Sequence, residues 1–155
     1  MTLKRPWQYS HFGRDLYWSL APQGFCLELL KEWIQSGDER NFAGALALLE
    51  THESDFVFRQ PEFIEFVFGH AQKLSSECFE RARSALHFCA TRHGESRTIG
   101  QPGPTTLATK ERAAEVAKKY PVGSTMADFY ESIVKRSEAR LAQEKLEDEE
   151  SFESE

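Results

Sequence analysis

The sequence predicts an all-α fold of six or seven helices with no sheet. Apolar residues recur at helical spacing, three or four positions apart, in five or six segments. No segment sustains the alternation of apolar and polar residues that is typical of a half-buried strand. The chain has 155 residues, of which 40% are hydrophobic and 28% charged, as in ordinary globular proteins. We therefore expect a single helical domain over residues 1–147.

The first predicted hairpin covers residues 22–52. Phe25, Leu29 and Trp33 lie four residues apart and form one apolar stripe on a helix over 22–36. Gly37 can take the left-handed conformation that ends this helix, and Asp38 is a good N-cap for a second helix over 38–52. A junction this short predicts two antiparallel helices.

The second predicted hairpin covers residues 61–93. Pro61 suits the first turn of a helix over 61–73, and Ser75 or Ser76 can cap a helix over 76–92. Residues 54–60 are too short for a strand and lack a partner strand. We expect them to form a packed turn with Phe56 and Phe58 buried.

The two hairpins repeat with a period of about 37–38 residues, near that of the HEAT and armadillo families. The matched segments are FCLELLKEWIQSGD…FAGALALLE and FIEFVFGHAQ…CFERARSALHF. The matched pairs include Phe25 with Phe63, Ala45 with Ala82, and Leu49 with Leu86. Residues 25–93 thus resemble a pair of bacterial HEAT-like repeats. The resemblance implies stacked antiparallel hairpins, as in an α-solenoid fragment, and binding to other proteins. The alternative is a generic antiparallel helix bundle.

A loop over residues 94–105 separates these hairpins from a third hairpin, predicted over 106–147. The loop contains three glycines, and we expect Pro102 and Pro104 to exclude helix from it. Thr105 or Thr106 should begin a helix over 106–119, and Ser124 or Thr125 a helix over 125–147. Long loops in compact domains often carry function, so this loop is a candidate binding element.

The net charge of -6 lies at the C-terminal end of the chain. Residues 138–155 hold eight acidic and two basic residues, whereas residues 1–137 are neutral. This balance makes nucleic acid an unlikely partner and gives no attraction to anionic membranes. Residues 148–155 are predicted to be a disordered acidic tail. The alternative is an acidic motif that docks on a basic partner.

The three cysteines are widely spaced in apolar surroundings, which favours buried thiols in a reducing, cytoplasmic compartment. Cys89 and His93 are four residues apart and could share a helix face as metal ligands. A zinc site needs three or four ligands, and only these two have suitable spacing. We therefore predict no metal site and no cofactor.

No catalytic motif is present, and the sequence predicts a non-catalytic protein–protein interaction or scaffold module. Such a module could be the C-terminal part of a longer helical-repeat protein. One alternative is a small inhibitory binding protein of the immunity-protein or antitoxin type, and another is a metal-dependent enzyme using Cys89 and His93. The ring-rich segment 7–18 is a further candidate contact surface. The expected binding residues are Arg92, Arg97, Gln101, Pro102, Pro104, Lys118 and Lys119.

Overall fold

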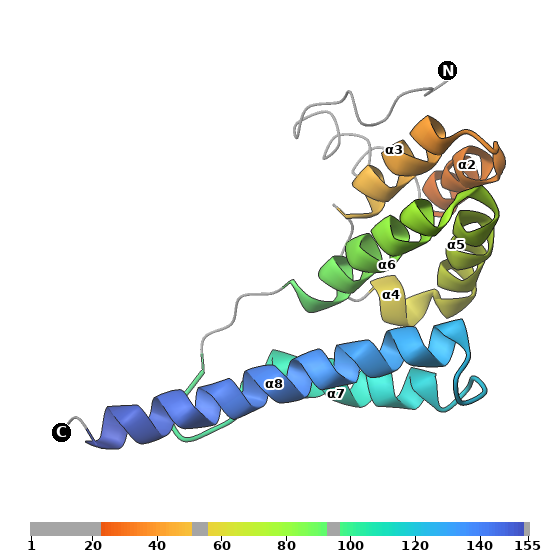
Figure 1. Cartoon of the computed structure of the whole chain (residues 1–155). Coiled ribbons are helices and arrows are strands. Elements are labelled where there is room, and N and C mark those ends of the chain that lie inside the picture. The colour runs from red at the N-terminus through yellow and green to blue at the C-terminus, as the bar shows by residue number, and fades with distance from the viewer. Residues whose placement is uncertain (1–22, 51–55, 93–96, 154–155) are drawn as a thin grey trace. The chain divides into compact units, whose positions relative to one another are not determined.

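The computed structural model describes residues 23–50, 56–92 and 97–153. Within these ranges it contains seven helices and no strand, which confirms the all-α prediction (Figure 1). The chain divides into two compact units, residues 1–89 and 90–155, where the sequence predicts one domain. The helices of the first unit are α2 (Gln23–Gln35), α3 (Glu39–Leu49), α4 (Phe56–Arg59), α5 (Pro61–Leu74) and α6 (Ser76–Thr91). Those of the second are α7 (Pro104–Ala117) and α8 (Thr125–Glu153).

The turn between α2 and α3 forms as the sequence predicts. Gly37 has a φ of 77°, a left-handed conformation that favours glycine. Asp38 is the N-cap of α3, and its carboxylate accepts a hydrogen bond of 2.7 Å from the backbone N–H of Arg40. These two residues end one helix and begin the next within three positions, so the chain reverses and α2 lies against α3.

Helices α4, α5 and α6 are joined by very short connections. The predicted packed turn is a single turn of helix, α4, in which Phe56 and Val57 are buried and Phe58 is half-buried. Phe56 meets Phe63 of α5 edge-on, with ring centroids 5.8 Å apart. Pro61 opens α5 as predicted, and the Ser75 hydroxyl caps α6 by accepting a hydrogen bond from the backbone of Cys78.

Two of the residue pairs matched by the internal repeat lie in the core of the first unit. Ala45 and Ala82 are fully buried, as are Leu49 and Leu86. The HEAT-like resemblance stays a prediction, because burial at matched positions is also expected of a generic bundle.

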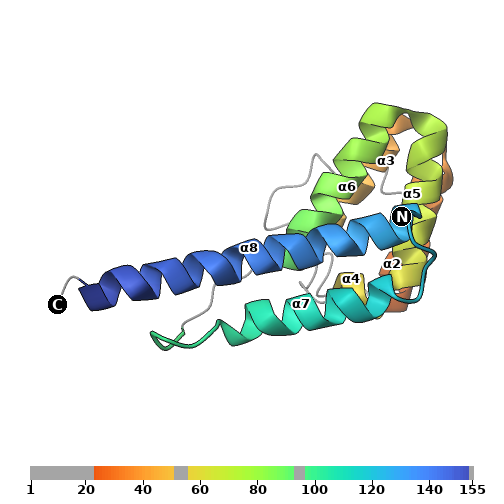
Figure 2. The same ribbon diagram turned by 60° about the horizontal axis from the view of Figure 1, so that its bottom comes forward.

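The second unit is a hairpin of α7 and α8, which run side by side in Figures 1 and 2. Helix α7 begins at Pro104, two residues before the predicted start. The expectation that Pro104 excludes helix is wrong, because a proline in the first turn loses no intrahelical hydrogen bond. Helix α8 begins after Ser124, whose hydroxyl accepts a hydrogen bond from the backbone of Ala127, and continues through Glu153. Residues 148–153, predicted as disordered tail, are thus helical.

Replacing Trp33 by Ala should destabilise the first unit by ~3–5 kcal/mol, because Trp33 is only 6% exposed and truncation leaves a cavity. Denaturant unfolding followed by far-UV circular dichroism measures this. The neighbouring variant Glu32→Ala is the control, since Glu32 is exposed and its loss should cost less than about 0.5 kcal/mol. A cost below about 1 kcal/mol for Trp33→Ala would contradict the packing described here.

Candidate functional site

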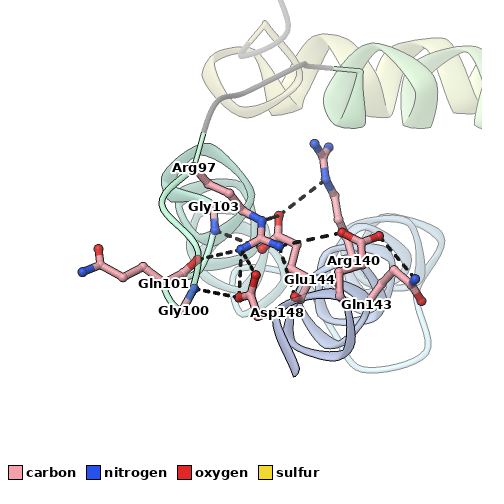
Figure 3. A network of polar contacts seen from close by, with 9 residues as sticks. Arg97, Gly100, Gln101, Gly103, Arg140, Gln143, Glu144 and Asp148 are labelled. Atoms are coloured by element: carbon pink, nitrogen blue, oxygen red, sulfur yellow. Dashed lines mark hydrogen bonds and ion pairs between the residues drawn. The ribbon is translucent and has the colours of Figure 1, made fainter. Parts of the chain in front are cut away.

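Arg97 connects the loop before α7, residues 97–103, to the C-terminal turns of α8 (Figure 3). The Arg97 guanidinium donates a hydrogen bond of 2.9 Å to the Asp148 carboxylate through Nη1, and one of 3.1 Å to the backbone carbonyl of Glu144 through Nη2. Nη1 also lies 3.3 Å from the carbonyl oxygen of Gln101, within the loop itself. The planar fork of arginine suits this arrangement because it directs several donors at fixed angles.

The carboxylates of α8 in turn accept hydrogen bonds from the loop backbone. The N–H of Gly100 donates to Asp148 at 3.0 Å, and the N–H of Gly103 donates to Glu144 at 3.0 Å. Gly100 has a φ of 90°, which favours glycine at this position. We call Arg97, Gly100, Gly103, Glu144 and Asp148 the Arg97 latch.

Charge strengthens the Arg97 latch. The hydrogen bond with Asp148 raises the pKa of Arg97. The same hydrogen bond lowers the pKa of Asp148, helped by the Gly100 N–H and the charge of Arg97 and opposed by burial. The side chains of Arg97, Glu144 and Asp148 are all at most 16% exposed. Solvent therefore screens this network less than it screens an ordinary surface ion pair.

The latch also explains why α8 is longer than predicted. Four consecutive acidic residues, 147–150, lie near the C-terminal end of α8, where the helix dipole disfavours negative charge. The last turn of α8 has no basic residue. Arg97 lies within 3.7 Å of carboxylate oxygens of Glu144 and Glu147 and bonds directly to Asp148. A cation from outside the helix thus offsets the repulsion between these carboxylates.

The residues expected to bind a partner have different surroundings. Arg97 turns inward and is engaged by α8, whereas Gln101, Pro102 and Pro104 are exposed beside it. The exposed Lys118 and Lys119 lie at the C-terminal end of α7, next to the α7–α8 turn. The half-buried Arg92 directly follows α6. Residues 94–96 of the predicted loop and the ring-rich segment 7–18 lie outside the described residues.

Sequence reasoning missed Glu144 and Asp148 as members of the site. The sequence predicts Asp148 as part of a disordered tail and gives Glu144 no role, because the segment is acidic and its apolar stripe ends at Leu141. Their spacing of four residues, which places two carboxylates on one helix face, was the available signal. Nothing local identifies their partner, because Arg97 precedes Asp148 by 51 residues.

A shallow groove of about 580 Å³ lies between α7 and α8 near their connecting turn. Apolar side chains and charged side chains of both signs line it. The lining residues are Ala114, Ala117, Lys118, Tyr120, Val122, Ala127, Glu131, Val134, Lys135 and Glu138. Because the charged residues that line the groove are of both signs, the groove favours neither an acidic nor a basic partner.

Exposed apolar side chains also occur at the other end of the hairpin. We call residues 97–103 and 144–153 together the latched end. Five large apolar side chains are exposed among the described residues, and three of them, Ile99, Leu146 and Phe152, belong to the latched end. Glu149 and Glu150 are exposed on the same turns of α8. The latched end therefore combines exposed apolar groups with negative charge.

The described residues contain no group of three or more His, Cys, Asp or Glu side chains placed to hold a metal ion. Cys89 is fully buried in α6, and His93 lies outside the described residues, so the alternative of a metal site at Cys89 and His93 is not tested by the structure. Among the helices of the described segments, none has the length and apolar character needed to cross a membrane.

Comparison with models of protein families, with curated proteins and with solved structures finds no match to this chain.

Acid should open the Arg97 latch at a lower pH than an ordinary aspartate would allow. Because the pKa of Asp148 is lowered in the folded state, its stabilising contribution is complete above its unfolded pKa of about 3.9 and is lost as the pH falls through the lower, folded value. Arg97, Glu144 and Glu147 are the charged groups around it. The amide NMR shift of Gly100, which donates to Asp148, reports the transition.

The variant Asp148→Asn is the control for this titration. Its Gly100 amide should resonate near the acid-state position of the wild type at every pH. The buried Gly44 of α3, remote in sequence, shows whether acid unfolds the first unit as well. A Gly100 midpoint at or above about 3.9, or a titration that survives in Asp148→Asn, would contradict the lowered pKa.

Proposed function

We propose that the chain is a non-catalytic protein-interaction module that binds a basic protein surface through its latched end. The observation that carries this proposal is the exposure of Ile99 on the loop and of Leu146 and Phe152 on α8, an ordered helix whose last turns also carry the exposed Glu149 and Glu150. Exposed apolar groups rimmed by polar residues are typical of protein-binding surfaces.

The charge of the latched end supports a basic partner. Residues 144–153 contain six acidic residues and one basic residue, Lys145. Arg97 draws Glu144 and Asp148 inward, whereas Glu149 and Glu150 stay exposed. Glu147 is 56% exposed even though it lies 3.7 Å from Arg97. Outward carboxylates of this kind would attract a positive surface and speed its association.

The latched end has an ordered conformation, and this supports the proposal further. A disordered acidic tail would lose conformational entropy on binding, whereas a helix that is already formed loses less. The Arg97 latch holds both the loop and the helix end in place before a partner arrives. The exposed Gln101 and Pro102 would then be contact groups, with Arg97 positioning them from behind.

An inhibitory binding protein of the immunity-protein or antitoxin type is the second candidate. It requires a negative patch on folded structure, and the extension of α8 through Glu153 supports such a patch. Its partner would be a basic enzyme whose activity falls on binding. For either candidate, the buried thiols of Cys78 and Cys89 support a reducing, cytoplasmic compartment. The HEAT-like packing proposed for residues 25–93 would serve as a scaffold for this end.

The proposal predicts which positions touch the partner. A photo-crosslinking residue at Phe152 or Ile99 should capture one discrete protein at equal stoichiometry in cells of the native host. The same residue at Phe88, an exposed ring on α6 of the first unit, is the matched control and should capture that protein weakly or not at all. Stronger capture from position 88 would place the interface elsewhere.

Charge reversal tests the chemistry of the same surface. Glu149→Lys with Glu150→Lys should weaken binding to the captured protein by about tenfold, because two outward carboxylates are lost. The control pair Glu32→Lys with Glu65→Lys changes net charge equally on exposed positions of the first unit. Equal weakening by both pairs would show a general charge effect and contradict a specific acidic surface.

A further inference from the structure

The latched end is made of two segments that depend on each other. Of the two hairpin helices, α8 runs on past the start of α7, and the loop lies beside its final turns (Figure 1). The loop has one internal backbone hydrogen bond of its own, from the Gln101 N–H to the Thr98 carbonyl. Its Gly100 and Gly103 N–H groups donate hydrogen bonds to carboxylates of α8.

The end of α8 has little positive charge of its own. Lys145 is the only basic residue among positions 144–153, and the acids at 147–150 oppose the helix dipole. Like charges at adjacent turns destabilise an isolated helix further. Arg140, one turn earlier in α8, lies 4.0 Å from the Glu144 carboxylate. The cation that meets Asp148 comes from the loop, since Arg97 contacts Asp148 and the backbone carbonyl of Glu144.

We propose that the Arg97 latch couples the order of loop 97–103 to the order of α8 residues 144–153, so that the two segments open and close as one unit. The loop needs the carboxylates to bind its amides, and the helix end needs the guanidinium to offset its charge. Opening either segment removes the partner of the other. We call the state in which both segments are ordered the closed state. That this coupling regulates binding rests on the proposed function, because the binding surface then exists only in the closed state.

A basic partner would favour the closed state. The Asp148 side chain is 13% exposed and stays behind Arg97, whereas Glu147 is 56% exposed. A cation on the partner would therefore reach Glu147, Glu149 and Glu150 without displacing Arg97 from Asp148. Binding and latch closure would then reinforce each other, because the partner recognises only the ordered helix.

Hydrogen exchange on the full-length chain tests the coupling without any partner. Arg97→Gln should speed amide exchange about tenfold or more in both segments, 98–103 and 145–153, while the α7–α8 turn stays unchanged. Arg83→Gln is the matched control, because Arg83 forms an exposed ion pair with Glu80 on α6 and its loss should change neither segment. Faster exchange in the loop alone would overturn the proposal, as would no change in either segment.

The reciprocal variant covers the case in which Arg97→Gln does not fold. Asp148→Asn changes only α8, yet coupling requires faster exchange in the loop as well as in the helix end. The double variant should be no faster than the faster single variant, since each opens the same unit. Arg97→Lys should restore part of the protection, because one ammonium can pair with Asp148 but lacks the planar fork. Additive effects in the double variant would show two independent segments.

Failure of this coupling and failure of the proposed function give different results. If exchange shows coupling but crosslinking from positions 99 and 152 captures nothing discrete, the latch is real and the interface lies elsewhere. If crosslinking succeeds but Arg97→Gln leaves exchange in 145–153 unchanged, the surface binds without the latch.

Discussion

The latched end of the second unit depends on the contact of one guanidinium, that of Arg97, with α8. Arg97 reaches a carboxylate and a backbone carbonyl of α8 at hydrogen-bonding distance, and two further carboxylates lie within 3.7 Å. A hairpin of two helices offers no third helix that could hold the loop over residues 97–103 against α8. One arginine does so here, because its fork can serve the helix and the loop backbone at once.

Local features of the fold could be predicted from the sequence because their causes are local. Asp38 accepts from the backbone two residues on, so its role as a cap follows from its type and its place before an apolar stripe. The same holds for Pro61 and Ser124, which begin α5 and α8 where expected. Helix periodicity likewise identified Trp33 as a core residue, and it is buried. In each case, the residues that determine the local structure lie within one or two helical turns of the residue in question.

The features that were missed depend on distant partners. Asp148 looked like part of a solvated tail because its neighbours are acidic, and only a cation 51 residues earlier in the chain gives it a structural role. From the sequence, Arg97 is expected to be an exposed contact group, because nothing near it in the sequence identifies its partners on α8. Pro104 is a different, local case, because prolines interrupt helices in general but are tolerated in the first turn. Periodicity and propensity carry no information about which loop meets which helix end.

The source of the cation decides what kind of surface the helix end can be. Helix α8 has few cations of its own here, namely Arg140, which lies 4.0 Å from the Glu144 carboxylate, and Lys145. Arg97 adds a cation from the loop on the inward face, where Glu144 and Asp148 lie. Glu149 and Glu150 keep their negative charge on a helix that is nonetheless ordered. An acidic surface and a stable helix end, which normally exclude each other, are therefore compatible here.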